Sequence, residues 1–169
     1  MAKIQMDTIT AATVYLDNNS FCGSATEISG PTIKNAMKEH SAVGMIGVKK
    51  LWVGFEAMQI DVTWDFFKEA VTDQFGDYNL KIYGNVSRRE NGTPRNLPVY
   101  MEMRCRVDDN DVMGSLKPQD WSGQKVTFTV DYIYIRHDGK DKLKIDIDKN
   151  IYEKDGVDML AEMKKNANL

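Results

Sequence analysis

Two short acidic segments come nearest to a recognisable chemistry. The run Asp109-Asn110-Asp111-Val112-Met113-Gly114 has spaced oxygen ligands and a turn glycine, and Asp146-Ile147-Asp148-Lys149-Asn150-Ile151 also has spaced oxygens. Calcium coordination needs six or more such oxygens converging on one ion. In the first segment Met113 occupies a ligand position and Asp120 stands where a bidentate glutamate belongs, while the second lacks the glycine and the distal acid. We expect no metal at either, and interpret them as a solvated loop and an alternating strand.

Catalysis has equally little support. The two histidines are His40 and His137, and His137 lies beside the expected turn at Asp138-Gly139, where a surface role is favoured. No serine or cysteine stands in a nucleophile-elbow context, and no glycine-rich phosphate loop occurs. Cys22 and Cys105 are too few for a disulfide framework and lack metal-binding spacing, so we expect reduced, buried thiols. The sequence therefore predicts neither an enzyme nor a bound cofactor.

Length and composition indicate one globular domain spanning residues 1–169. Apolar residues make up 42% and charged residues 28%, which excludes the disordered class. No apolar run approaches the roughly 18 residues of a membrane-spanning helix, and the start of the chain has no apolar core of signal-peptide length. The net charge of −3 argues against a dedicated DNA-binding protein, which would display a basic face.

Charge is nevertheless unevenly distributed along the chain. Acidic residues dominate positions 49–77, and basic residues dominate positions 78–107, where Arg88, Arg104 and Arg106 lie. Two interpretations stay open. These are either two ordinary solvated faces, or complementary surfaces that meet between identical subunits and set their register.

The elements that must position these residues are mostly strands. The strongest local signal is a hairpin in which residues 132–136 turn at Asp138-Gly139 into 143–147, because both turn residues must tolerate positive φ. Other strands are expected at 13–16, 21–28, 32–43, 48–53, 58–63, 78–88, 97–107 and 125–136, the last with Val126, Phe128, Val130, Tyr132 and Tyr134 on one face.

One interior helix is predicted over residues 64–75. Trp64, Phe67 and Val71 follow helical spacing, Thr63 can cap the start, and Gly76 follows the end. Residues 108–122 are expected to form a long loop. The terminal helix has about eight residues, fewer than the ~12–15 that an isolated helix needs, so it must dock on something. The predicted fold is mainly β, an antiparallel sandwich or partly closed barrel with these two helices.

Several motifs together are similar to one family. They are an opening strand-turn-strand at 14–23, a proline-bearing segment at 28–33, Gly44-Met45, and 54–58. Near the end come Asp138-Gly139-Lys140, then Ile145-Asp146, then 156–161 and a basic helix that ends at Leu169. In their order and spacing the chain resembles the major tail tube proteins of contractile-tailed phages and the tube subunit of R-type pyocins. Two glycines usual in the family are Asn19 and Asn168 here, and the asparagine usual after the Ile-Asp pair falls at Asn150 or is replaced by Lys149.

The resemblance implies a structural subunit that assembles into hexameric rings with a continuous inner β-barrel. The rings stack into a tube inside a contractile sheath, and in phages DNA passes through the lumen during ejection. The implied partners are other copies of the chain, the sheath, baseplate and tape-measure proteins and, non-specifically, DNA, with no membrane binding. The implied location is the virion tail, assembled in the cytoplasm of a bacterial host.

A channel that conducts DNA should repel phosphate rather than hold it. We therefore expect acidic residues at alternating strand positions to line the lumen, with Glu39, Asp61 and Asp131 as candidates; the alternative places them on the outer face or between subunits. A lumen lined by Arg88, Arg104 and Arg106 would refute this. The candidates for contacts between stacked rings lie in two segments, 44–54 and 156–169: Gly44, Met45, Lys49, Lys50, Gly156, Val157, Asp158, Leu160 and Leu169.

Other functions compete with this interpretation. One is the tube of a DNA-free secretion or tailocin machine, which the sequence alone does not separate from a phage tail. Another is a monomeric β-sandwich module that binds a carbohydrate or other ligand, which would need clustered aromatic residues in a concave site.

Overall fold

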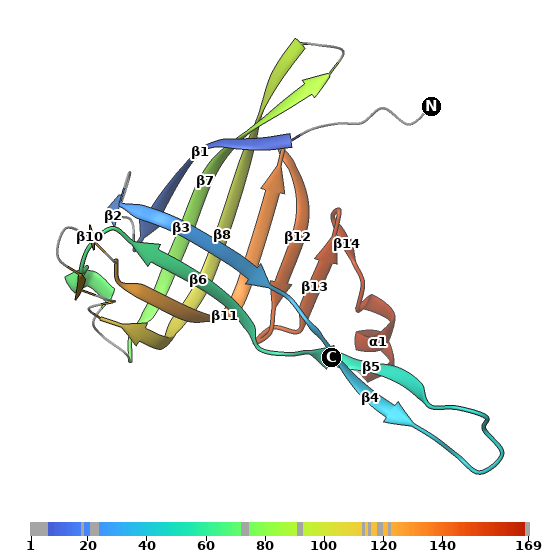
Figure 1. Ribbon diagram of the computed structural model, residues 1–169. Coiled ribbons are helices and arrows are strands. Elements are labelled where there is room, and N and C mark those ends of the chain that lie inside the picture. Colours follow the sequence, from blue (N-terminus) through green and yellow to red (C-terminus); the bar gives the residue numbers. More distant parts are fainter. Residues whose placement is uncertain are drawn as a thin grey trace.

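The computed structural model describes residues 7–17, 19–20, 24–71, 75–90, 93–112, 114, 116–117, 120–121 and 123–167. This part of the chain is mainly β, as predicted, with one short 3-10 turn and one short terminal α-helix (Figure 1). The elements are β1 (Asp7–Leu16), β2 (Asn19–Ser20), β3 (Ala25–Thr32), β4 (Asn35–His40), β5 (Lys49–Phe55), β6 (Met58–Trp64), η1 (Glu69–Val71), β7 (Asp77–Glu90), β8 (Thr93–Asp111), β9 (Leu116–Lys117), β10 (Asp120–Trp121), β11 (Lys125–His137), β12 (Lys140–Asp146), β13 (Ile151–Lys154), β14 (Val157–Asp158) and α1 (Ala161–Ala167).

Most strands belong to one branched antiparallel sheet. Its main path runs β14-β13-β12-β11-β8-β7-β1-β2. The branch starts at β11, whose first half also pairs with β6, and β6 pairs in turn with β3. The strands β4 and β5 form a separate hairpin that projects from the body (Figure 1). We call residues 35–55 the arm. The described strands do not close into a barrel.

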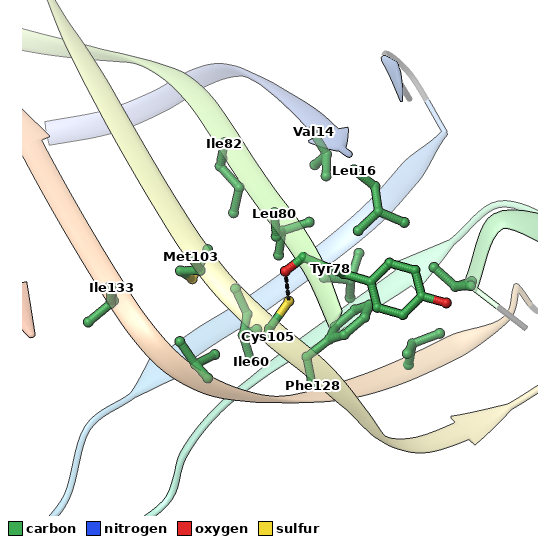
Figure 2. Close-up of a cluster of buried hydrophobic side chains, with 14 of the residues drawn as sticks. Val14, Leu16, Ile60, Tyr78, Leu80, Ile82, Met103, Cys105, Phe128 and Ile133 are labelled. Atoms are coloured by element: carbon green, nitrogen blue, oxygen red, sulfur yellow. Dashed lines mark hydrogen bonds between the residues drawn. The ribbon is translucent and has the colours of Figure 1, made fainter. Parts of the chain in front are cut away.

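The branch folds the sheet into two layers that enclose the core. In Figure 1, β3 and β6 cross in front of β7 and β8. The alternation in β6 explains this position, because Met58, Ile60, Val62 and Trp64 are buried while the residues between them point away from the core. Facing side chains from β1, β7, β8 and β11 complete the core (Figure 2). Each large apolar side chain buried there contributes roughly 1.5–3 kcal/mol.

Cys105 lies inside this core as a free thiol, as predicted. Its Sγ donates to the Tyr78 carbonyl oxygen at 3.5 Å (Figure 2). Removal from water raises the pKa of the Cys105 thiol to about 12, so the group stays protonated and packs as a small apolar side chain. Cys22 lies outside the described residues.

The strand β11 belongs to both layers, and two irregularities in its pairing with β8 allow this. The register shifts between Thr127 and Phe128 and again between Val130 and Tyr132. Such β-bulges bend a strand and increase its twist. Val126, Phe128 and Val130 face the core as predicted, but the next buried residue is Ile133. The prediction that Tyr132 and Tyr134 share their face was therefore wrong, because the extra residue Asp131 reverses the alternation.

The hairpin at Asp138-Gly139 is confirmed. Tyr132 pairs with Asp146 and His137 with Lys140, and both turn residues have positive φ (51° and 71°). After β12 the chain forms β13 and β14 and ends in α1, a seven-residue helix. None of the helices in the described segments combines the length and apolar character needed to span a membrane.

The predicted interior helix over 64–75 is wrong. Trp64 ends the strand β6, and only Glu69–Val71 form a 3-10 turn, while residues 72–74 lie outside the described part. In a helix starting at Trp64, the Lys68 N–H would donate to the Trp64 carbonyl. Instead it donates to Oε1 of Gln124 at 2.7 Å, and the Asp65 N–H donates to the Ser24 carbonyl at 2.7 Å. Tertiary hydrogen bonds therefore replace those of the expected helix.

The long loop expected at 108–122 is shorter in the structure. Strand β8 continues to Asp111, and β9 pairs with β10 in a small hairpin. The polar residues 109–111 extend β8 because Thr127, Val126 and Lys125 of β11 pair with them. Positions 113, 115, 118–119 and 122 lie outside the described residues.

Candidate functional site

One layer, made of β3, β6, β11 and the end of β8, presents a continuous polar face away from the core. Directly paired residues of antiparallel strands point to the same side, so the registers define rows across all four strands. The three rows on the outward side are Glu27-Thr63-Lys125-Asp111, Ser29-Asp61-Thr127-Asp109 and Thr32-Gln59-Thr129-Arg106. Every one of these side chains is polar.

This surface carries five carboxylates, whereas the three rows contain only two cations, Lys125 and Arg106. Asp108, the extra residue of the bulge in β8, joins it because its Oδ2 accepts a hydrogen bond from Nε2 of Gln59 at 3.0 Å. Within the described residues only one of the five, Asp61, has an ion-pair partner. We call this surface the acidic face and define it by Glu27, Asp61, Asp108, Asp109 and Asp111.

Asp61 occupies the middle of the face. Its Oδ1 accepts a hydrogen bond from the Thr127 hydroxyl at 2.7 Å, and its Oδ2 lies 3.1 Å from the Lys125 ammonium. The Thr127 hydroxyl, followed by Lys125, holds the pKa of the Asp61 carboxyl below its usual value, because both favour the charged form. Asp61 is therefore a fixed negative charge at neutral pH.

The structure separates the three candidates for the channel lining. Asp61 lies on the acidic face. Glu39 lies on the arm, 3.7 Å from Lys50, and Asp131 lies at the bulge of β11, 2.8 Å from Arg106. Each carboxylate is thus compensated by a different cation of its own subunit.

Two of the three arginines whose presence in the lumen would refute an acidic lining, Arg104 and Arg106, are also paired with carboxylates. Arg106 lies in the third row of the polar face, where Asp131 and Asp77 flank it at 2.8 and 3.1 Å and raise the pKa of its guanidinium. Arg104 faces Asp146 and Asp148 at the end of β12. These basic side chains of the 78–107 segment are therefore engaged within one subunit.

The acidic segments first considered for calcium lie apart. Asp109 and Asp111 spread along β8, and Asp146 is buried beside Arg104 and Lys149. Among the described residues, no three acidic, histidine or cysteine side chains are grouped as a metal site requires. The spacing of Asp109 and Asp111 along β8 therefore produces an acidic surface rather than a metal-binding site.

The arm carries the first set of predicted ring contacts. Gly44 and Met45 form its tip, where Gly44 has a φ of 91°, and Lys49 and Lys50 begin the returning strand. The tip is apolar and exposed, since Val43 and Ile46 are fully accessible. An exposed apolar loop on a projecting hairpin is typical of a contact made with another molecule.

The C-terminal segment carries the second set, and the structure brings it to the base of the arm. Trp52, Phe55 and Tyr152 form a chain of edge-to-face rings with centroids 5.6 and 5.1 Å apart. A cleft of about 200 Å³ lies there, lined by these rings and by Leu160 and Met163. The two segments therefore meet in one region, although 100 residues separate them in the sequence.

Local hydrogen bonds hold the C-terminal segment in place. Gly156 turns the chain with a φ of 81°, and Val157 and Asp158 form β14. Asp158 accepts from the Leu160 N–H at 2.9 Å and pairs with Lys164 at 2.8 Å, so it fixes the start of α1. Leu169, the last predicted contact residue, lies outside the described residues.

Sequence reasoning missed Glu27, Asp108, Asp109 and Asp111 as members of one surface. The alternation of β6 identified Asp61, but the other four depend on the pairing register and on a bulge. Those features are set by contacts between strands distant in sequence, which no local pattern encodes.

Comparison with known proteins gives a consistent result. A family model described as phage tail tube protein FII matches residues 6–167. The tail tube protein of Escherichia phage P2 is 23% identical over 164 residues, which cover 92% of this chain and 94% of that protein. A solved chain of the PVC sheath/tube terminator, from an extracellular contractile injection system, has a TM-score of 0.54 at 14% identity and covers 75% of this chain and 94% of its own. A chain of the PVC sheath-tube complex has a TM-score of 0.52 at 14% identity, with coverages of 75% and 88%.

Proposed function

This chain belongs to the phage tail tube protein FII family and is a structural subunit of a contractile tail tube, not an enzyme; we propose that six copies close into a ring and that the rings stack into a hollow tube. The observation that carries the proposal is the open four-strand layer. Its edge strands are free to pair with neighbouring copies, and its polar face is suited to line a water-filled channel.

The edges of the layer support ring closure. Within the described residues, β3 pairs only with β6, and residues 107–111 of β8 pair only with β11. All pairings in the layer are antiparallel, so its two edge strands, β3 and β8, run in opposite directions. In a rotational ring the β8 edge of one copy therefore meets the β3 edge of the next with antiparallel polarity. Six copies form a continuous barrel of this kind without an exposed edge.

The acidic face then lines the lumen. Exposed carboxylates repeated around the barrel repel the phosphates of DNA, whereas a basic lining would hold them. We propose that this face lets DNA slide during ejection. Of the three residues first considered, Asp61 takes this position; we assign Glu39 to the arm and Asp131 to the rim of the face.

The connectivity supports stacking. Strand β6 starts at the base of the arm and ends at Trp64, seven residues and about 20 Å away. Beyond it, Phe66 and Phe67 are 56% and 38% exposed. Each subunit therefore carries an apolar arm tip at one end and exposed phenylalanines at the other. Contact between unlike ends propagates without closing and produces a filament.

We also propose the wider assembly. The sheath surrounds the tube, the baseplate and tape-measure proteins set its start and length, and rings form in the cytoplasm of a bacterial host before they enter a virion tail. The whole chain, residues 1–169, acts as one tail-tube domain.

Shortening the arm tests the stacking contact directly. His40 and Lys49 are paired across the hairpin, so residues 41–48 can be replaced by Asn-Gly, which favours a two-residue turn. The replacement keeps both strands and removes the apolar tip. Concentrated wild-type protein, or protein seeded with baseplates, should give hollow tubes in negative-stain electron microscopy, whereas the variant should stop at rings.

A second variant checks the C-terminal contribution. A chain that ends at Asp155 lacks β14 and α1 and should remain soluble without forming long tubes. Normal tubes from both variants would contradict the assignment of the stacking contacts. Absence of rings and tubes from the seeded wild-type chain would contradict the proposed function itself.

A further inference from the structure

Four tyrosines form a ladder across the outward face of the second layer, which contains β1, β7, β8 and the second half of β11. The ring centroids of Tyr15 and Tyr83 lie 5.4 Å apart, those of Tyr83 and Tyr100 4.9 Å, and those of Tyr100 and Tyr134 6.2 Å. The rings come from β1, β7, β8 and β11, so the ladder crosses four strands. We call this surface the tyrosine face and define it by these four residues.

Hydrogen bonds hold two rings of the ladder in place. The Tyr100 hydroxyl donates to Oε2 of Glu102 at 3.0 Å, and the Tyr134 hydroxyl donates to Oδ1 of Asp141. Burial and the Glu102 carboxylate raise the pKa of Tyr100, and the Asp141 carboxylate raises that of Tyr134. Tyr100 and Tyr134 are thus neutral and held in one orientation, which lowers the conformational entropy lost when a partner binds.

Charges on this face are matched, unlike those of the acidic face. Lys81 pairs with Glu102 at 3.9 Å, Arg136 with Asp141 at 3.2 Å and Lys144 with Glu153 at 3.7 Å. A balanced surface exerts little long-range attraction or repulsion. Recognition here therefore depends on short-range packing against the rings, of which Tyr83 is the most accessible at 49% exposed.

The position of the ladder limits its partner. Leu80 and Ile82 of β7 point into the core, so Lys81 and Tyr83, which alternate with them along the strand, point to the opposite side of the layer, away from β3 and β6. Ring closure uses the edges of the first layer, and stacking uses the arm and the opposite end. The tyrosine face is used by neither contact between copies, and it points outward when the acidic face points into the lumen.

We propose that the tyrosine face is the surface on which the sheath subunit docks, with aliphatic and arginine side chains of the sheath packed on the tyrosine rings. Tyrosine is enriched at protein interfaces because it combines a large apolar ring with a hydroxyl, and its ring attracts arginine. The inference rests on the proposed tube, and it names the surface by which that tube holds its sheath.

Photocrosslinking tests the assignment in particles assembled in producing cells. With p-benzoylphenylalanine at position 83, we expect a covalent product with the sheath subunit, identified by mass spectrometry. The same probe at position 61 should give no sheath product. A product between two copies of this chain at position 83, or no product in fully formed tubes, would overturn the proposal.

Substitution gives an independent measurement. Tyr83→Ala should leave tube length unchanged and lower the fraction of sheathed tubes about tenfold, as expected for loss of an anchoring aromatic residue. Tyr83→Phe, which keeps the ring, should restore sheathing to near wild-type. Equal sheathing of the alanine variant and wild type would contradict the inference while leaving the tube intact. Failure of the wild-type chain to form tubes would instead contradict the proposed function.

Discussion

The acidic face and the tyrosine face cover opposite sides of the same core, yet they differ in how far their charged side chains are paired. On the tyrosine face, Lys81, Arg136 and Lys144 each have a carboxylate partner. On the acidic face, Asp109 and Glu27 have no ion pair within the described residues. The difference indicates two tasks, since a matched surface suits close contact with protein and an unmatched acidic surface suits repulsion of a polyanion.

Strand β11 shows how one element serves both faces. Its first half contributes Lys125, Thr127 and Thr129 to the polar rows, and its second half contributes Tyr134 to the ladder. The bulge at Asp131 bends the strand between these halves, and Arg106 bonds the Asp131 carboxylate there. Together with the register shift at Thr127 and Phe128, this bulge redirects the strand from one layer to the other.

Reversing charge on the acidic face should have the largest effect. The triple variant with Asp108, Asp109 and Asp111 changed to lysine should make assembled tubes bind a short DNA duplex in their lumen. Binding should fall by about a thousandfold between 50 and 200 mM salt, because lysine–phosphate contacts release counterions. Retention of the duplex after nuclease treatment measures binding inside the tube.

A matched variant sharpens that result. Changing Glu102, Asp141 and Glu153 to lysine places the same added charge on the tyrosine face. Duplex bound there should be digested, because it lies outside the tube. Protection of DNA by this second variant, and not by the first, would reverse the assignment of the two faces.

Truncation of aromatic residues should have the next largest effect. Phe128→Ala leaves a cavity between the two layers and should lower the free energy of unfolding by about 3–5 kcal/mol. Tyr83→Ala removes ring contacts of an exposed side chain and should cost only about 0.5–1.5 kcal/mol. Chemical denaturation of the unassembled subunit measures both. Similar losses would indicate that the tyrosine ladder is part of the core rather than a contact surface.

The smallest effect concerns Asp61. The pKa of the Asp61 carboxyl is lower in the folded state than its unfolded value of 3.8. The charged carboxylate therefore stabilises the fold at pH values above 3.8. This contribution is lost as the pH falls through the lower pKa of the folded state. Asp61→Asn should therefore reduce the loss of stability below about pH 4, by less than about 1 kcal/mol because the ion pair is partly exposed. In a Thr127→Val background the same substitution should have a smaller effect. An unchanged pH profile in both backgrounds would contradict the role of the Thr127 hydroxyl.

Local patterns predicted most of the strands. The alternation of β6 and the Asp138-Gly139 turn are confirmed because each depends on residues adjacent in sequence. The helix expected from Trp64 is wrong because Gln124, some 60 residues away, supplies the acceptor for the Lys68 N–H. Helical spacing of apolar residues does not reveal such a competing partner.

The candidate surfaces were predictable only in part. Asp61 and the two apolar contact segments follow from the sequence and the family resemblance. The acidic rows and the tyrosine ladder require the register of β3, β8 and β11, including two bulges. Because a one-residue shift moves a side chain to the opposite face, neither surface follows from composition or spacing.

The most direct test is a cryo-electron microscopy reconstruction of the assembled tube at side-chain resolution. We predict that Asp61, Asp109 and Glu27 line the lumen and that the edges of β3 and β8 join neighbouring copies, with the tyrosines on the outer wall. A lumen lined by Tyr83 and Tyr100, with the acidic rows outside, would contradict the central claim.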